Sequence, residues 1–392
     1  METSKNKNLL QKKKIAIVGG GPGGLTLAKL LQLKGANVKV YERDENKETR
    51  VQGANVDLHY DSGLKVIKAA GLLDAFKVNY MKGADKTRMV DKDGNVCFEE
   101  YNDEADNFDN EFFRPEIDRG VLRNVLLDSL LPGTVIWDSQ FSDAKQVNGE
   151  LELTFKNGTK VIADILIGAD GYHSKIRPLV TDIKELYSGA TFIQGEIEYP
   201  EKDCPEMLEL VNQANLIAMG VGKTIAVQPS GNGSRLTFYT AAMLPEAWVK
   251  DSGIDFNNCE EVYDYLVKFY DGWNPLFLRL FKACKSFVPR PINYFPLDQN
   301  WEAHSNITLI GDAAHLMPPS GEGVNTAMLD ALDLMECLTA EEFDDLQIAI
   351  GAYEKRMFER AAALAKEAIN GIKDFASPSV ESVEKLIQQF KH

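Results

Sequence analysis

The residues with the clearest chemical meaning form a glycine-rich turn near the N-terminus. Gly19, Gly21 and Gly24 make the pattern G-x-G-x-x-G after the apolar run at 15–18. The first glycine permits a tight turn, the second lets backbone amides approach a pyrophosphate, and the third lets a helix pack closely on the strand. A diphosphate would lie at the N-terminus of that helix, where free N–H groups favour negative charge. Glu42, which ends the next apolar run, has the spacing that binds an adenosine ribose.

A lone pattern of this kind is often an ordinary turn, so the surrounding residues decide its meaning. Here an apolar strand, an apolar helical stretch and a second strand surround it in the expected order. Two later motifs place an acid directly after an apolar run, one at 168–171 with Asp170 and one with Asp312. We therefore predict a nucleotide-cofactor protein in which three distant segments meet at one site.

The patterns around these motifs predict an α/β fold. The first unit is β-α-β, and turn dipeptides at 148–149 and 157–158 predict a β-meander that leads into Asp170. Residues 183–285 change character and predict an antiparallel sheet, which is the candidate substrate domain. Apolar residues from 346 to 372 recur in steps of three and four and predict a long C-terminal helix. A helix is also predicted over 61–73.

The composition narrows the classes of partner. The chain has 392 residues, of which 44% are hydrophobic and 26% charged, and its formal net charge is −16. This charge argues against electrostatic binding to nucleic acid or to an anionic membrane. No apolar run approaches the roughly 20 residues that span a bilayer. The cysteines are scattered without a C-x-x-C pair or metal-ligand spacing, so we expect a cytoplasmic protein without a metal centre.

The order and spacing of the three motifs resemble those of the group A FAD-dependent monooxygenases, which have the fold of para-hydroxybenzoate hydroxylase. Within that family, five strings look like those of the tetracycline-inactivating flavin monooxygenases: VYERD at 40–44, VDLH at 56–59, PEIDR at 115–119, TVIWD at 134–138 and GDAAHLMPP at 311–319. The resemblance covers nearly the whole chain. It implies a Rossmann-like FAD-binding domain with a β-meander, an antiparallel-sheet substrate domain and a long C-terminal helix.

The implied domain limits are discontinuous. The FAD-binding domain takes residues 1–75, 100–182 and 286–340, the substrate domain takes 76–99 and 183–285, and the C-terminal helix and tail take 341–392. We expect that helix to bridge the two domains.

The resemblance also implies a noncovalent FAD site. Asp312 would bind the ribityl chain, Asp170 would serve FAD and NAD(P)H, and Arg50 would serve NADPH. From helical periodicity alone, Arg119 and Arg123 would instead form a solvated helix face, and Arg50 would be a surface residue. The residues implied for the cofactors are Gly19, Gly21, Gly24, Glu42, Arg43, Arg50, Asp57, Arg119, Asp170, Asp312, Pro319, Gly323, Val324 and Asn325.

The implied substrate site departs from the tetracycline enzymes. Gln194 preserves a drug-contacting glutamine, but an arginine, a phenylalanine and a histidine of their pocket align with Asn215, Ala226 and Thr237. Pro318 and Gly321, in the loop before the late helix, complete the predicted substrate residues. Loss of a charged group and two rings would weaken recognition of a large polar polyketide, because hydrogen-bonding sites discriminate strongly.

The implied activity needs no catalytic side chain. NADPH would bind transiently, without a Rossmann domain of its own, and would reduce FAD. O₂ would then yield a C4a-hydroperoxyflavin that hydroxylates a phenolic or enolic molecule. Tetracycline-type antibiotics are the first substrate candidate. His315 would be structural. Two alternatives stay open: a hydroxylase of another aromatic or polyketide metabolite, and a flavin-binding carrier without turnover. We expect a monomer.

Overall fold

A parallel sheet organises the half of the molecule that contains all three motifs. The computed structural model describes residues 9–49, 55–82, 84, 86–99, 106–147, 149–230 and 233–381. The strands of this sheet, in spatial order, are β17 (Ile307–Leu309), β11 (Ile165–Gly168), β1 (Lys14–Val18), β2 (Asn37–Tyr41) and β7 (Val135–Ile136). Gly168 pairs with both Val18 and Leu309, and Val18 pairs with Tyr41. The carboxyl ends of four strands therefore meet at one edge, where open α/β sheets bind their ligands.

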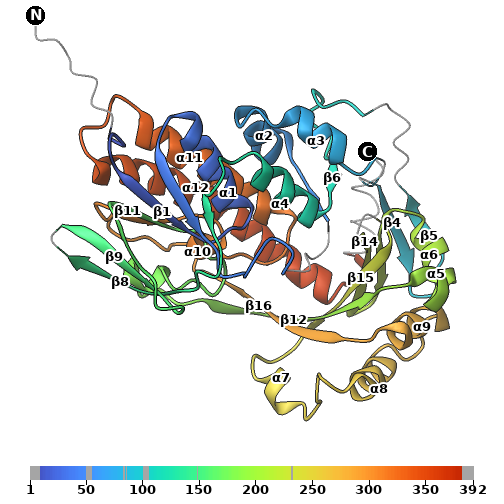
Figure 1. The fold of residues 1–392 in the computed structure, drawn as a ribbon. Coiled ribbons are helices and arrows are strands. Elements are labelled where there is room, and N and C mark those ends of the chain that lie inside the picture. Colours follow the sequence, from blue (N-terminus) through green and yellow to red (C-terminus); the bar gives the residue numbers. More distant parts are fainter. Residues whose placement is uncertain are drawn as a thin grey trace, which may run out of the picture.

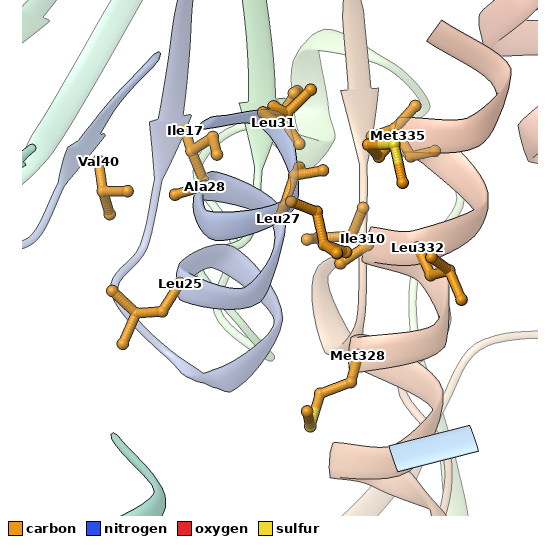
Figure 2. Close-up of a cluster of buried hydrophobic side chains, with 14 of the residues drawn as sticks. Ile17, Leu25, Leu27, Ala28, Leu31, Val40, Ile310, Met328, Leu332 and Met335 are labelled. Carbon is orange, nitrogen blue, oxygen red and sulfur yellow. The ribbon is translucent and has the colours of Figure 1, made fainter. Parts of the chain in front are cut away.

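Helices cover this sheet because their apolar faces match its buried strands. The principal ones are α1 (Pro22–Leu33), α4 (Arg119–Asp128), α11 (Glu322–Thr339) and α12 (Leu346–Ala376). Figure 2 shows α1 and α11 side by side, with Leu27, Leu31 and Met335 among the apolar side chains between them and the sheet. These side chains are buried at the helical spacing that the sequence predicts. The core therefore fixes α1 and α11 relative to the strand ends.

Smaller elements complete this half. The predicted meander consists of β8 (Phe141–Val147), β9 (Glu150–Phe155) and β10 (Lys160–Ala163), and β3 (Val56–Asp57) pairs with β6 (Glu116–Ile117). The turn between β9 and β10 has Gly158 at φ +85°, as its dipeptide predicts, whereas Asn148 lies outside the described residues. Two short helices, η2 (Arg177–Leu179) and α10 (Asp312–His315), follow the second and third motifs.

The single helix predicted over 61–73 is wrong. Three pieces stand there instead: a π-helix, η1 (Tyr60–Leu64), followed by α2 (Lys65–Ala69) and α3 (Leu73–Asn79). Gly71 has φ +70° and ends the second piece, because a left-handed residue cannot continue a helix. The Gly63 N–H donates to Asn325 Oδ1 over 3.1 Å, which holds the first piece against α11.

The second half is a seven-stranded sheet, drawn below the first half in Figure 1. Its strands, in spatial order, are β16 (Phe287–Tyr294), β12 (Leu186–Ile197), β15 (Arg235–Met243), β14 (Lys223–Ser230), β13 (Asn215–Gly220), β4 (Thr87–Asp91) and β5 (Val96–Glu99). All neighbours are antiparallel except β13 and β4. The predicted antiparallel sheet is thus confirmed with one parallel pair, which is allowed because β4 comes from a distant part of the chain.

The two faces of this sheet pack against different partners. Outer-face residues such as Ile193 and Phe238 join a core with the helices α6 (Pro205–Val211), α7 (Trp248–Asp251), α8 (Cys259–Phe269) and α9 (Pro275–Ala283). The short helix α5 (Pro200–Asp203) precedes α6. Inner-face residues such as Phe192 and Ala241 pack on Ile372 of α12. Side chains alternate between faces along a strand, so the inner face is the one turned toward α12 and the parallel sheet (Figure 1).

The long C-terminal helix is confirmed, and it touches both halves. Its Tyr353 Oη donates to Leu309 O of the parallel sheet over 2.9 Å, and its Ile372 and Ala376 pack on the inner face of the second sheet. The exact domain limits stay a prediction. Among the described helices, none combines the length and the apolar character that crossing a bilayer requires.

Candidate functional site

The glycine-rich turn is crowded on one side and open on the other. Gly19 has φ +113°, and a Cβ added to it would lie 2.2 Å from Ala169 O. A Cβ on Gly24 would lie 2.1 Å from Gly19 O, whereas one on Gly21 would meet no atom within 4 Å. Two glycines are therefore required by packing. The third leaves an open backbone surface at the N-terminus of α1, which fits an approaching diphosphate.

Buried polar contacts hold this turn in place. Glu42 Oε2 accepts a hydrogen bond from Gly20 N over 2.5 Å, and its Oε1 accepts from Asp44 N over 3.0 Å. Arg123 donates from Nε to Gly20 O over 3.1 Å and from Nη2 to Asp44 over 3.2 Å. The solvated helix face is thus wrong for Arg123, which is buried because the start of α4 packs on the turn. Sequence reasoning missed this role, since helical periodicity does not reveal a partner in another segment.

Two predicted cofactor arginines have no structural support of this kind. Arg43 is exposed next to the turn, and Arg50 lies outside the described residues. Their assignment to FAD and NADPH stays a prediction.

Asp312 and Arg119 face the same region at the carboxyl edge of the parallel sheet. Asp312 keeps solvent-exposed surface, yet the surrounding protein raises the pKa of its carboxyl, and the charges of His315 and Arg119 act in the opposite direction. Arg119 begins α4, and its Nε is buried without a hydrogen-bond partner among the described residues. A buried donor without a protein partner near a carboxylate fits a ligand rich in hydroxyl and carbonyl groups, as FAD is.

The loop between α10 and α11 lies between two predicted cofactor acids. A Cβ on Gly321 would lie 3.6 Å from Asp57 Oδ1, and one on Gly323 would lie 4.0 Å from Asp312 Oδ1. The loop contains buried Pro318 and exposed Pro319. The N–H groups of the first turn of α11, up to Val324, have no intrahelical acceptor and remain for a ligand.

Asn325 positions this loop. Its carboxamide is buried and accepts from His59 N over 2.9 Å and from Gly63 N over 3.1 Å. It also donates to Asp57 O over 2.9 Å and to Gly321 O over 3.2 Å. Because protein groups occupy both ends of the carboxamide, Asn325 acts here as a clasp between η1 and α11. Its predicted cofactor role is therefore indirect.

A charged bridge reinforces the clasp. His59 Nε2 lies 2.7 Å from Asp57 Oδ2, and its Nδ1 lies 3.2 Å from Glu322 Oε1. Burial by itself would lower the pKa of His59, but hydrogen bonds and charges from Asp57 and Glu322 raise it to about 9. The imidazolium therefore ties β3 to the first turn of α11 at neutral pH.

Replacing His59 by glutamine should weaken the decrease in the free energy of unfolding that occurs as the pH rises into the alkaline range. A group whose folded pKa is raised stabilises the protein fully below its unfolded value of about 6.5 and loses that contribution as the pH rises through about 9. We expect His59→Gln to lower the free energy of unfolding by about 2–3 kcal/mol at pH 6 and by much less at pH 10. Urea unfolding at both pH values measures this difference. An equal loss at both values would contradict it, and His304→Gln, whose ring has one 3.4 Å contact with Val180 O, is the control.

The middle motif is tied to the late motif by an arginine. Asp170 accepts from Ser174 Oγ and from Lys175 N, both over 2.6 Å, and so shapes its own turn. Arg177 donates to Ala313 O over 3.1 Å and to Ala314 O over 2.8 Å. Arg177 follows this motif closely in the sequence, but its contact with α10 joins two distant segments and is visible only in the structure.

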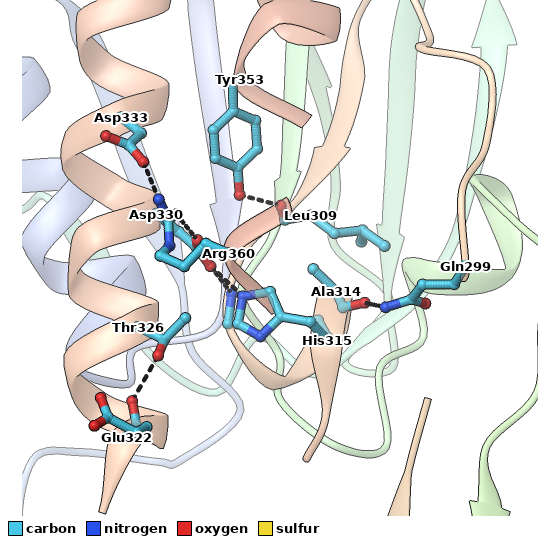
Figure 3. Close-up of polar contacts among 12 residues, drawn as sticks. Gln299, Leu309, Ala314, His315, Glu322, Thr326, Asp330, Asp333, Tyr353 and Arg360 are labelled. Carbon is cyan, nitrogen blue, oxygen red and sulfur yellow. Dashed lines mark hydrogen bonds and ion pairs between the residues drawn. The ribbon is translucent and has the colours of Figure 1, made fainter. Parts of the chain in front are cut away.

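A buried ionic network joins α10 to α11 and α12 (Figure 3). Asp330 Oδ2 lies 2.5 Å from His315 Nε2 and accepts from Gly311 N over 2.8 Å. Arg360 of α12 donates to Asp330 Oδ1 over 2.7 Å and to Asp333 over 2.5 Å. The network gives His315 the structural surroundings that we predict. Asp330 and Arg360 carry no sequence signal, because each is one charged residue within a helix.

The predicted substrate residues other than Pro318 and Gly321 share the inner face of the second sheet. Ala226 and Gln194 both pair with Tyr239, which places the three side chains in one row. Thr237 lies two residues before Tyr239 on β15 and so has its side chain on the same face. Asn215 likewise lies two residues before Ile217, the partner of Ala226, on β13. Thr237 and Asn215 have protein partners: Thr237 donates to Ser230 Oγ over 3.1 Å, and Asn215 donates to Glu116 Oε1 over 3.0 Å.

Fold and site together define an FAD-binding α/β protein with a sheet that closes its cofactor edge. Comparison with known proteins agrees: the family described as FAD binding domain matches residues 12–185 and 299–367, and the chain belongs to it. The chain is 28% identical to "Monooxygenase asqM" of Emericella nidulans, over 89% of this chain and 92% of the relative.

Two solved structures share the fold. The Klebsiella pneumoniae protein HpxO, complexed with FAD and uric acid, is 21% identical with a TM-score of 0.77, covering 99% of this chain and 95% of that one. The tetracycline destructase Tet(55) is 21% identical with a TM-score of 0.74, covering 96% and 95%. These findings confirm the resemblance to group A flavin monooxygenases and the prediction of an FAD-dependent monooxygenase.

Proposed function

We propose that this protein is an NADPH-dependent FAD hydroxylase of a phenolic or enolic small molecule. The observation that supports it most is the meeting of three distant motifs at one sheet edge, beside the Nε of Arg119, which is buried and has no partner in the described part of the chain. When bound, FAD supplies the hydride and oxygen chemistry, and the protein supplies position and charge.

Different residues would bind different parts of FAD. The open backbone at Gly21 and the N-terminus of α1 would hold the diphosphate. Each Glu42 carboxylate oxygen accepts one backbone N–H and keeps a second lone pair, which would accept from the ribose hydroxyls. Asp312 and Arg119 would bind the ribityl hydroxyls and neighbouring polar atoms. The first turn of α11 would lie against the isoalloxazine ring, where its N–H groups and dipole favour negative charge. NADPH would bind transiently, and FAD noncovalently.

Tetracycline-type antibiotics are the first substrate candidate, because the sequence strings of the cofactor site resemble those enzymes and Gln194 is preserved. Asn215, Ala226 and Thr237 favour the second candidate, another aromatic or polyketide metabolite, because they replace a charge and two rings. We expect a monomer with O₂ and a small molecule as its reaction partners.

One assay tests the proposal. NADPH-dependent O₂ uptake is measured against a panel of tetracyclines and phenols, and products are checked by mass for a gain of one oxygen. Stimulated uptake with that mass gain supports hydroxylation. A yellow protein that never oxidises NADPH with any compound would instead be a flavin carrier.

Replacing Asp312 by alanine should reduce FAD binding. The change removes an acceptor that the ribityl hydroxyls would use, so we expect about tenfold to hundredfold weaker FAD affinity, equivalent to about 1–3 kcal/mol. The flavin-to-protein ratio after purification and a titration with added FAD measure it. Asp128→Ala, at an exposed position of α4, is the control. Wild-type flavin content in the Asp312 variant would remove this residue from the site.

A further inference from the structure

The inner face of the second sheet has a cation at an edge where the sequence does not predict one. Arg290, in edge strand β16, pairs with Phe192 of β12, which places its side chain on the inner face. Its Nε donates to Gln194 Oε1 over 2.6 Å. Gln194, the predicted substrate residue of this sheet that resembles the tetracycline enzymes, therefore holds a guanidinium.

The charge of Arg290 is available to a ligand. Among the described residues, no carboxylate lies within ion-pair distance of it, whereas the neighbouring acid on this face, Glu196, pairs with Arg235. The bond to Gln194 uses Nε and leaves both terminal nitrogens of the guanidinium. Two terminal N–H groups in a fixed plane match the two oxygens of a carboxylate or of an enolised diketone.

The rest of the row suits a flat ring. Beyond Gln194, the row continues through the Tyr239 phenol to Ala226 and Ile217, which are half-buried and apolar or small. Burial and the charge of Glu196 raise the pKa of Tyr239, and the charges of Arg119 and Arg290 oppose that shift. Tyr239 also pairs with Gln194, the residue that holds Arg290, so its phenol lies on the same row as the cationic sheet edge.

On β13, toward the other side of the sheet, the predicted substrate residue Asn215 already has a protein partner. Asn215, which aligns with the pocket arginine of the tetracycline enzymes, donates to Glu116 of β6. The side that would otherwise recognise an anion thus has a neutral amide with a protein partner. The cation that this face offers to a ligand is therefore Arg290 of β16, whereas β13 offers a neutral amide.

We propose that Arg290, oriented by Gln194, binds an anionic oxygen group of the substrate, which makes the substrate class an acidic aromatic or enolic compound. This inference rests on the proposed hydroxylase function. Gln194 is then a positioning residue, and Arg290 determines specificity.

The test uses the FAD-loaded protein and matched ligand pairs. The probes are 4-hydroxybenzoate, salicylate and gentisate, each with its neutral methyl ester, and binding is followed by the change in flavin absorbance. We expect the wild-type protein to prefer the acids by about tenfold, as one charge-assisted bidentate pair provides. Arg290→Gln should remove that preference with unchanged flavin content, and Arg290→Lys should restore part of it.

Two controls complete the design. Arg279→Gln removes a guanidinium from α9, on the other side of the sheet, and should leave the preference intact. Gln194→Ala should weaken acid binding less than Arg290→Gln does, because the charge remains. The inference is overturned if wild-type protein binds acids no better than esters, or if Arg290→Gln keeps the preference.

The outcome for the hydroxylase proposal is separate. Preferential acid binding without any stimulation of NADPH oxidation would contradict the hydroxylase proposal but would still support the anion site. Equal stimulation of oxidation by acids and esters would support the hydroxylase and overturn the role of Arg290.

Discussion

Replacement of Asp330 by asparagine should lower the free energy of unfolding by about 3–5 kcal/mol, because it leaves the buried His315 without its anionic partner and removes one of the two carboxylates that pair with Arg360. The Asp330 carboxylate is fully buried and forms ion pairs with His315 and Arg360. It also accepts a hydrogen bond from the Gly311 N–H. Breaking such a network by removing one partner costs far more than the pair contributes when intact. An amide keeps the shape but not the charge, so the loss reports the electrostatic part.

The pH dependence has a definite sign. Burial would raise the pKa of Asp330, but His315 and Arg360 lower it overall. Its contribution is therefore fully present above the unfolded value of about 3.9 and is lost as the pH falls through the folded value. Burial would lower the pKa of His315, yet Asp330 raises it, so its share is present below about 6.5 and lost as the pH rises through the folded value.

Urea unfolding at pH 6, with both groups charged, measures the effect. Asp333→Asn is the matched control, because Asp333 is partly exposed and, within this network, forms an ion pair with Arg360 and with no other residue. We expect it to cost about 1 kcal/mol. A stability of Asp330→Asn within about 0.5 kcal/mol of the wild type would mean that the network does not carry a buried charge pair.

A pair of glycine substitutions should separate folding from cofactor binding. A methyl group on Gly24 would lie 2.1 Å from Gly19 O, so α1 must move away from the strand. We expect Gly24→Ala to lose about 1–3 kcal/mol of stability and at least about tenfold in FAD affinity. Gly21 has φ −81° and open space around it, so alanine fits the fold there. Gly21→Ala should keep the wild-type stability but lose at least about tenfold in FAD affinity, because its methyl group occupies the surface that a diphosphate approaches.

Two measurements check this pair. Urea unfolding without added flavin gives stability, and quenching of FAD fluorescence gives affinity. Gly371→Ala, in α12 with no atom within 4 Å of the new methyl group, controls for the substitution itself and should be slightly stabilising. Wild-type FAD affinity in Gly21→Ala would exclude this turn as the diphosphate site.

Local patterns predicted the fold where one segment contains the whole signal. The β-α-β unit, the meander and the C-terminal helix are examples, because side-chain periodicity and turn residues act within a few residues of each other. The helix predicted over 61–73 failed for two reasons: Gly71 inside the segment adopts a left-handed conformation, and the π-helical first piece is held by Asn325, more than 250 residues away. The parallel pairing of β4 with β13 likewise joins distant segments.

The sequence by itself determined the chemistry of the cofactor edge. Glycine at 19, 21 and 24, the acid at 42 and the acid at 312 have meaning through residue type and local spacing, since a missing side chain or a carboxylate after a strand limits what can bind there. Only the tertiary structure decided which charges serve that edge. Arg123 turned inward, Asp330 became the centre of a buried network, and Arg290 came beside Gln194. Each role depends on a partner from another element, and folding creates that contact by packing side chains whose own neighbours along the chain carry no trace of it.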